Sequence, residues 1–450
     1  MLVKTRFKYV PPILKLGIPL IIGELGSIAQ QFADTMMVGH HSTVELAASG
    51  FSNSIFYFVI FLSLGMSYAS TPLIASAFGR KNSTKILRNL AESLITNLLV
   101  GIFFVLVLLL LIWQVQIFNQ PPEILNYVRP YMLLLTTSVP FLTLFNSLKQ
   151  YLDALGKTQI AMIILICSNI LNIFLNWCLI FGHCGLPELG LVGAGISTLV
   201  SRIVQFIVIA VVAYREARME KRMGQVMQAN MSPTHLGVIR QIRLGLPISI
   251  QLGLEIAIFN VCGVFMGWLG VIPLAAHQAM YTITTLCFQV LYGVASAGSI
   301  LTSQYFGRRE WTEIRQIART AFCVGLGIVT VIISSIVLTF EPIMSFFTTD
   351  EAVKAVMRQL LPFFVLYQLG DCAQITYANA LRGIEKTAPL MKNAIIAYVL
   401  VCLPLSYYFA FVVGWGSSGV WLGIPIGLSL AGLLFYLNFR KQVRNLLIKK

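Results

Sequence analysis

Long apolar runs separated by short polar connections follow one another along the whole chain. A helix rises about 1.5 Å per residue, so about 20 apolar residues cross a hydrocarbon core of roughly 30 Å. The apolar runs are continuous and do not alternate with a period of two, so a transmembrane barrel is not expected. The pattern predicts an all-α polytopic membrane protein with twelve spanning helices, at residues 12–38, 47–77, 90–118, 126–152, 159–182, 190–213, 244–269, 276–305, 320–345, 355–380, 388–413 and 419–438.

The two halves of the chain repeat each other. Gly-Ile-Pro at 17–19 returns as Gly-Leu-Pro at 245–247, and Phe-Gly-Arg at 78–80 returns at 306–308, both at an offset of 228 residues (245 − 17 and 306 − 78). Six helices per repeat is an even number, so both repeats enter the membrane in the same orientation. We therefore expect two six-helix bundles related by a pseudo-twofold axis along the membrane normal.

The longest polar connection separates the two repeats. It defines an N-terminal bundle at 1–213, a cytoplasmic linker at 214–243 and a C-terminal bundle at 244–450. Proteins built from two such repeats usually carry a solute between them, with alternating access by rocking. Because this path lies within one chain, we expect a monomer.

Lys and Arg residues gather in every second connection. Of the 32 basic residues, only Arg129, Lys354 and Arg358 are placed near outer ends and Arg202 at depth, which leaves 32 − 4 = 28 on the side of both termini. The positive-inside rule then predicts that both termini are cytoplasmic. The same distribution accounts for the net charge of +15 without a nucleic-acid partner.

The composition agrees with a protein of the lipid bilayer. Hydrophobic residues make up 57% of the chain and charged residues only 11%, whereas soluble domains carry about 25% charged residues. Seven of the eight cysteines lie in or beside apolar runs, and no CxxC pair occurs. Neither a disulfide framework nor a zinc site is expected, and no cofactor is implied.

Two acids lie deep in apolar runs of the second half. Glu255 lies ten residues after Gly245, near the midplane, and Gln251 precedes it by one turn. Asp371 has Tyr367 and Gln374 at helical spacing, which places the three side chains on one face. A buried acid is costly unless it meets water, a partner or an ion, and oxygen groups suit a hard cation such as Na⁺. A structural hydrogen-bonded carboxyl group between packed helices is the alternative.

The first half carries one comparable acid. Asp34 has Gln30 one turn before it, and the fifth span carries a polar stripe of Asn169, Asn172 and Asn176. Amide groups of this kind could simply bind neighbouring helices together. Beside such amides, Asp34 could instead take up and release a proton.

Three further polar residues lie within apolar runs. Glu24 is either an additional cavity charge for a cationic substrate or an ordinary paired acid. Arg202 is a candidate counter-ion for one of the acids. His277, beside Gln278, is more often a satisfied helix contact than a proton carrier.

Several motifs together resemble the multidrug and toxic compound extrusion (MATE) family, in its NorM-like bacterial branch, over essentially the whole chain. They are Gly17 to Pro19, Phe32 to Gly39, Asn172 to Trp177, Pro187 to Gly195, Ala275 to Gln278, and Asp371 to Gly383. The resemblance implies a protein of the bacterial inner membrane with a central cavity between its two bundles. Through this cavity it would export cationic, often aromatic, amphiphilic compounds, driven by the inward flow of Na⁺ or H⁺. Glu24 departs from the family pattern, where a neutral residue is more usual.

We assign residues to two roles on these grounds. The cation-coupling residues are Glu255, Asp371, Tyr367 and Asp34, with Glu255 and Asp371 as candidate Na⁺ ligands. The substrate cavity is assigned to Gln30, Asn172, Asn176, Gln278, Gln251, Gln374 and Glu24.

Two other functions compete with drug export. A lipid-linked oligosaccharide flippase of the same superfamily would be expected to line its cavity with several arginines. Here the charged residues expected at depth are one arginine, Arg202, and four acids, Glu24, Asp34, Glu255 and Asp371, which suits a cationic substrate. A membrane enzyme would need a catalytic cluster, and no HExxH or GxSxG occurs. Gly156-Lys157-Thr158 lacks the first glycine of a P-loop, so ATP is not expected to be the fuel.

Overall fold

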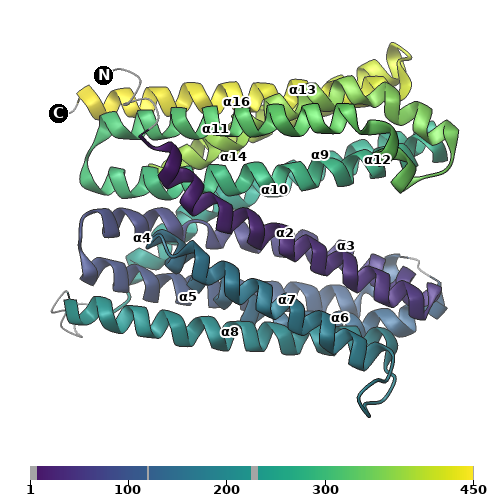
Figure 1. Cartoon of the computed structure of the whole chain (residues 1–450), viewed down its shortest axis with the longest axis horizontal. Helices are drawn as coiled ribbons and strands as arrows, with labels where there is room; N and C mark the ends of the chain where they lie inside the picture. The colour runs from purple at the N-terminus through teal and green to yellow at the C-terminus, as the bar shows by residue number, and fades with distance from the viewer. Residues whose placement is uncertain (1–7, 119–120, 224–231, 449–450) are drawn as a thin grey trace. The chain divides into compact units, whose positions relative to one another are not determined.

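A computed structural model describes residues 8–118, 121–223 and 232–448, and most of these residues lie in long helices (Figure 1). The predicted all-α membrane architecture is confirmed. The linker predicted at 214–243 lies partly outside the described residues. The main helices are α2 (Val10–His41), α3 (Thr43–Ser67), α4 (Ser70–Gly79), α5 (Ser83–Trp113), α6 (Pro122–Ala154), α7 (Thr158–Ile180), α8 (Gly190–Met223), α9 (His235–Leu269), α10 (Val271–Arg308), α11 (Trp311–Leu338), α12 (Phe340–Phe347), α13 (Glu351–Gly383) and α16 (Gly416–Ile448).

Shorter helical segments complete the described chain. A 3-10 turn, η1 (Val115–Phe118), follows α5. The span predicted at 388–413 is helical but not a regular α-helix, because π-helical turns interrupt it. Its segments are α14 (Ala388–Ala394), η3 (Ile395–Cys402), α15 (Leu403–Tyr407) and η4 (Tyr408–Val412).

Eleven helical segments of the described chain are long and apolar enough to cross a membrane, counting α3 with α4 as one and Ala388–Val412 as another. The remaining predicted span, 355–380, is α13, which has 33 residues and is also long enough. Its apolar run is interrupted by Gln368, Asp371 and Gln374, all of which are buried. The helix that falls short in hydropathy is therefore one that carries a candidate site.

The described chain forms two compact units, which we number 1 and 2. Unit 2 is Ile22–Ser249, and unit 1 combines Met1–Ile21 with Ile250–Lys450. Both boundaries fall inside continuous helices, α2 and α9, and they are again 228 residues apart (249 − 21). The bundles predicted at 1–213 and 244–450 divide the chain by sequence, whereas the compact units exchange the first segments of α2 and α9.

An acid of the receiving unit holds the start of each exchanged segment. In unit 1, the hydroxyl group of Tyr9, directly before α2, donates to Glu313 of α11. In unit 2, the hydroxyl group of Thr234, directly before α9, donates to the buried Glu92 of α5 at 2.7 Å. The two segments are therefore fixed by the same kind of contact.

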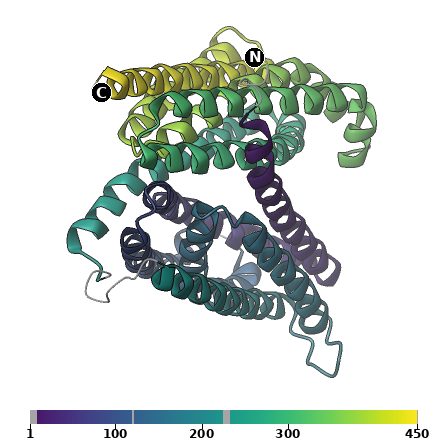
Figure 2. The same ribbon diagram turned by 60° about the vertical axis from the view of Figure 1, so that its left-hand side comes forward.

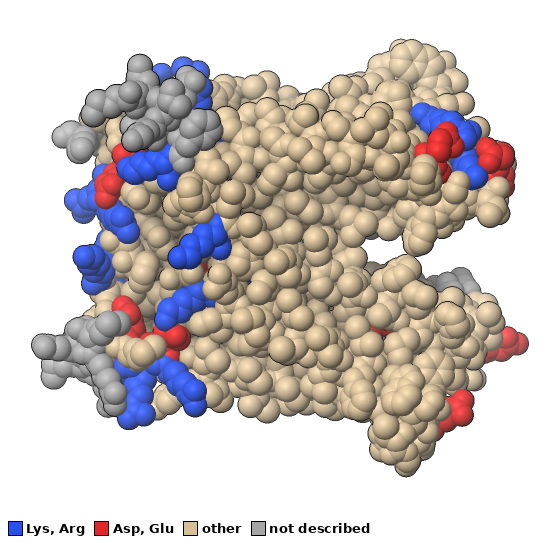
Figure 3. Space-filling model, viewed as in Figure 1, with Lys and Arg blue, Asp and Glu red and all other residues tan. Residues whose placement is uncertain are grey.

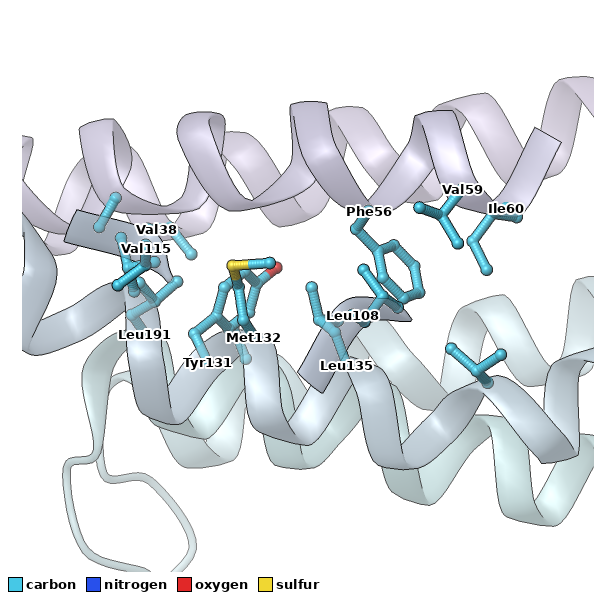
Figure 4. Close-up of a cluster of buried hydrophobic side chains, with 14 of the residues drawn as sticks. Val38, Phe56, Val59, Ile60, Leu108, Val115, Tyr131, Met132, Leu135 and Leu191 are labelled. Carbon is cyan, nitrogen blue, oxygen red and sulfur yellow. The ribbon is translucent and has the colours of Figure 1, made fainter. Parts of the chain in front are cut away.

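Apolar side chains of four helices form a core in unit 2. Figure 4 shows Phe56 of α3, Leu108 of α5, Tyr131 and Leu135 of α6, and Leu191 of α8 directed toward a common interior. Figure 2 shows the helices of this unit grouped side by side. Burial of this kind contributes about 25 cal/mol of folding free energy per Å² of apolar surface. It therefore fixes the orientation of α6 and α8, which also carry polar residues described below.

In unit 1, α13 packs against α10, α11 and α16. Phe364 of α13, with Trp421 and Phe435 of α16, is fully buried in this packing. The first segment of α2 joins the same unit, where Ile13 contacts a cluster that includes Ile300 of α10. Asp371 of α13 is therefore held within an apolar frame.

Lys and Arg residues lie mainly at one end of the helices in each unit. Figure 3 shows them in blue over the helix ends nearest the chain termini in unit 1, and at one end of the helices of unit 2. The opposite ends show few charged residues, and several of these are acidic. Near the start of α13, Arg358 pairs with Glu341 at 2.8 Å.

Two glycines allow the exchanged segments to pack closely. A Cβ atom on Gly65 of α3 would lie 2.4 Å from the Cα atom of Ser249, and one on Gly293 of α10 would lie 3.0 Å from the backbone nitrogen of Ile21. These pairs are related by the repeat, because 293 − 65 and 249 − 21 both equal 228. A side chain at either position would separate the helices.

We predict that Gly65→Ala lowers the stability of the purified protein by about 1–3 kcal/mol, the usual cost of overpacking. Gly50→Ala in the same helix is the matched control, because a Cβ atom there meets nothing within 4 Å. Thermal unfolding in detergent measures both variants. Equal melting temperatures for the two variants would contradict the close packing at Gly65.

Candidate cation sites in the two units

Glu255 of α9 lies at the centre of a hydrogen-bonded cluster in unit 1. Its carboxylate accepts hydrogen bonds from the amide nitrogens of Gln251 at 2.8 Å and Gln374 at 3.1 Å. The amide of Gln374 also donates to the hydroxyl group of Tyr398 in η3 at 2.9 Å. The three residues assigned from the sequence, Glu255, Gln251 and Gln374, are therefore brought together, and Tyr398 is an addition.

Arg382 is a buried cation that was not assigned to the site from the sequence. It lies in the last turn of α13, is 3% exposed and donates to the side-chain oxygen of Gln251 at 2.7 Å. A long side chain at a helix end can turn inward, which helical spacing does not reveal. Through Gln251, Arg382 is coupled to Glu255, whose negative charge it stabilises electrostatically.

Asp371 has a different environment from Glu255. It is fully buried, and neither carboxylate oxygen has a hydrogen-bond partner among the described residues. The nearby groups that act on it are the carboxyl group of Glu255 and the hydroxyl group of Tyr367, one turn earlier on α13. Both polar atoms of the Gln368 amide also lack a partner within the described chain.

The charges of this cluster do not balance when both acids are ionised. Glu255 and Asp371 contribute two negative charges and Arg382 one positive charge, which leaves −1. An uncompensated charge in a membrane interior is costly. A proton or a monovalent cation at the acid pair would remove this imbalance. Tyr367, Gln368 and Gln374 are buried on the same helix as Asp371 and carry oxygen atoms of the kind that bind such cations.

Asp34 of α2 forms the corresponding site in unit 2. It accepts a hydrogen bond from the amide nitrogen of Asn176 at 2.5 Å, and the same nitrogen lies 3.3 Å from the side-chain oxygen of Asn172. Both asparagines are fully buried on α7. Gln30 is a second amide beside Asp34. Asp34 and Gln30 of α2 and the stripe residues Asn172 and Asn176, all assigned from the sequence, are therefore brought together.

Arg202 of α8 balances the charge of Asp34. Its guanidinium group donates to the hydroxyl group of Ser138 at 2.5 Å and lies 5.0 Å from the centre of the Phe56 ring. Its positive charge acts on Asp34 and stabilises the carboxylate. The pair is neutral when both are ionised, unlike the cluster in unit 1, so the role of counter-ion suggested for Arg202 fits Asp34.

Glu24 is paired rather than free. Its carboxylate lies 2.8 Å from the ammonium group of Lys149 on α6, and both side chains are largely buried. Asp153, one turn after Lys149, is buried in the same electrostatic neighbourhood. Of the two readings of Glu24, this geometry favours the ordinary paired acid.

A pocket of about 440 Å³ opens between α9 and α10 in unit 1. Gln278, assigned to the substrate cavity, lines it beside the buried His277. Aromatic rings form much of its wall, and this feature was not recognised from the sequence because helix orientation was unknown. The remaining lining residues are Phe259, Asn260, Gly263, Val264, Gly267, Trp268, Leu274 and Tyr281.

Aromatic contacts connect this pocket to the acid pair. The ring of Phe259 lies 5.0 Å from that of Tyr281, on the pocket wall, and 5.7 Å from that of Tyr367, which neighbours Asp371. A shift of Phe259 would therefore change the packing both at the pocket wall and beside the acid pair.

We predict that Lys149→Met destabilises the protein by up to about 3 kcal/mol, because it leaves two buried acids without their cation. The double variant Lys149→Met, Glu24→Gln should recover a large part of this loss. Thermal unfolding of Lys149→Met, Glu24→Gln and the double variant measures the coupling between the two residues. Strictly additive losses would show that Lys149 and Glu24 do not depend on each other.

The MatE family model matches residues 19–178 and 247–408. The chain is similar to the multidrug resistance protein NorM of Vibrio cholerae (29% identity, covering 94% of this chain and 93% of the relative) and to the probable multidrug resistance protein NorM of Photorhabdus laumondii (26%, covering 98% of each).

Solved structures agree in fold. A multidrug resistance MATE family transporter in an outward-facing conformation superposes with a TM-score of 0.87 at 21% identity, covering 97% of this chain and 96% of that one. A MOP superfamily transporter from Pyrococcus furiosus gives 0.86 at 22% identity, covering 98% and 96%. The resemblance noted in the sequence is confirmed: the chain belongs to the MATE family of transporters, so it is not an enzyme, and it is similar to the NorM multidrug resistance proteins over nearly its whole length.

Proposed function

We propose that the protein is a secondary antiporter that exports amphiphilic organic cations in exchange for inward Na⁺ or H⁺. The observation that carries this proposal is the environment of Asp371, which is fully buried beside Glu255, has the hydroxyl group of Tyr367 nearby, and accepts no hydrogen bond of good geometry among the described residues. Such an acid is stable only when it is protonated or holds a cation. A group that must exchange one of these during each cycle is suited to couple transport to an ion gradient.

The charge balance assigns different roles to the two units. In unit 1, the acid pair exceeds Arg382 by one negative charge, whereas in unit 2 Arg202 offsets Asp34. The coupling ion should therefore bind at Glu255 and Asp371. Asp34, held by Asn176 and screened by Arg202, then serves as a secondary group that tunes the substrate path.

The pocket beside this site suits a flat cationic compound. Its volume of about 440 Å³ falls within the range of roughly 300–1,000 Å³ that is usual for drug-sized ligands. The rings of Phe259, Trp268 and Tyr281 offer π faces that attract organic cations. Gln278 and Asn260 add polar contacts at the wall.

Ion and drug would oppose each other through this arrangement. A cation or proton at the acid pair removes the negative charge that attracts a cationic drug, and the Phe259 contacts connect the two places. By linkage, the drug then weakens ion binding by the same factor. A coupling free energy of about 1–3 kcal/mol would give a 5- to 150-fold effect, which is sufficient for exchange under a gradient.

The orientation follows from the distribution of basic residues. The connections between α2 and α3, between α7 and α8 and between α9 and α10 contain no Lys or Arg, whereas Arg80, Lys81, Arg308 and Arg309 lie at the opposite helix ends. The positive-inside rule then places both termini in the cytoplasm of a bacterial cell, with the protein in the inner membrane. One chain contains both candidate sites, so a monomer suffices.

We predict that Asp371→Asn and Glu255→Gln each abolish ion-driven efflux of a fluorescent organic cation from proteoliposomes. A sodium gradient and a pH gradient are imposed separately, so the assay also identifies the coupling ion. Asp34→Asn should retain measurable efflux with an altered rate. Normal efflux by both unit 1 variants would refute the proposed coupling site, and loss of efflux only in Asp34→Asn would move it to unit 2.

If Na⁺ couples transport, we predict that it raises the melting temperature of the wild-type protein and not that of Asp371→Asn. A ligand at ten times its dissociation constant stabilises the folded state by about 1.4 kcal/mol. Potassium at equal ionic strength is the control. A sodium response that persists in Asp371→Asn would place the sodium site elsewhere, and no response in the wild type would leave protons as the coupling ion.

A further inference from the structure

Two thiols meet at the outer end of unit 2. Cys178, in the last turn of α7, and Cys184, in the connection to α8, have their sulfur atoms 3.7 Å apart. No disulfide framework was expected from the sequence, because the cysteines lie mostly in apolar runs without a CxxC pair. The turn after α7 brings together a pair separated by five residues.

The backbone of this turn is shaped to hold Cys184 in place. Gly182, Cys184 and Gly185 all have positive φ, at 71°, 59° and 76°. A non-glycine residue in this region is uncommon, so the conformation of Cys184 is maintained by its surroundings. The backbone nitrogen of His183 donates to the carbonyl oxygen of Cys178 at 2.9 Å, which closes the turn directly over the α7 end.

Side-chain contacts support the same geometry. The ring of His183 stacks on that of Trp177, with centres 4.2 Å apart and planes inclined by 12°. Further along the connection, Glu188 accepts a hydrogen bond from His41 at 3.0 Å. The connection is therefore fixed to the bundle on both sides of Cys184.

The two sulfur atoms differ in access. Cys178 is buried and Cys184 is exposed, so a reagent can reach Cys184 first. A disulfide bond is about 2.05 Å long, and the sulfur atoms would have to approach by about 1.7 Å (3.7 − 2.05). Rotation of the exposed Cys184 side chain is the movement that can provide this approach.

We propose that Cys178 and Cys184 form a disulfide bond on the outer face of the membrane. This rests on the orientation proposed above, in which the connection between α7 and α8, free of Lys and Arg, faces the oxidising side. The Cys184 thiolate attacks the disulfide bond of an oxidant protein in that compartment. This breaks the bond of the oxidant, and Cys184 forms a mixed disulfide with one of its two sulfur atoms. The Cys178 thiolate then displaces the oxidant, which leaves as a dithiol carrying both electrons and both protons.

The bond would stabilise the end of the helix that serves Asp34. Asn176, whose amide donates to Asp34, lies two residues before Cys178 on α7. A covalent link between the α7 end and the connection that carries Glu188 would keep this end from unwinding. The bond therefore supports the unit 2 site without taking part in ion exchange.

Thiol counting on the full-length protein tests the proposal. The tryptic peptide Thr158–Arg202 contains three cysteines, Cys167, Cys178 and Cys184. Cells are dissolved in denaturant with excess N-ethylmaleimide. The mass of the peptide is then measured by mass spectrometry, before reduction and again after reduction and a second treatment with maleimide. We expect one maleimide before reduction and three after it (3 − 2 = 1). Three maleimides before reduction would overturn the proposal.

A second measurement identifies the side of the membrane and the structural effect. After reduction of intact cells, a membrane-impermeant maleimide should label Cys184; labelling only after the membrane is opened would overturn the proposal. A reducing agent should lower the melting temperature of the wild type and of the matched control Cys167→Ser on the same helix. It should have no effect on Cys184→Ser, and an equal effect on that variant would also overturn the proposal. These readouts do not depend on drug efflux, so they stand apart from the antiport assay.

Discussion

The structure of unit 1 depends on the cost of placing a carboxylate in an apolar helix bundle. Glu255 accepts hydrogen bonds from two amide groups and lies near the charge of Arg382, whereas Asp371, although fully buried, accepts no hydrogen bond of good geometry among the described residues. Transfer of an uncompensated charge into such a medium is expensive. The bundle can tolerate Asp371 only if a proton or cation accompanies it, and this requirement is what would connect the site to an ion gradient.

The backbone around the two acid sites follows the internal repeat of the chain. The two unit boundaries, the two proline positions and the glycine contacts at Gly65 and Gly293 all recur at 228 residues. Each unit therefore holds the first helix segment of the other half by close backbone packing. The acid site departs from this symmetry, because unit 1 has an excess negative charge and unit 2 has a neutral pair. The difference between the two acid sites is thus electrostatic, on a backbone that repeats.

The fold and part of the site could be predicted from the sequence because they depend on local patterns. Apolar runs located the helices, and spacing of three or four residues placed Asp371 with Tyr367 and Gln374, and Asn172 with Asn176. Contacts between helices could not be predicted in the same way. The inward turn of Arg382, the pairing of Lys149 with Glu24 and the aromatic pocket beside His277 all depend on tertiary packing. Periodicity along one helix contains no information about which neighbour it meets.

Proton release on sodium binding tests the central claim most directly. Sodium is added to the purified protein in a weakly buffered solution at a pH where the acid pair holds its proton, and the released protons are counted for the wild type, Asp371→Asn and Asp34→Asn. If the pair in unit 1 exchanges one cation for another, the wild type and Asp34→Asn release protons and Asp371→Asn does not. Release that persists in Asp371→Asn and disappears in Asp34→Asn would contradict the account, because the exchanging acid would then lie in unit 2.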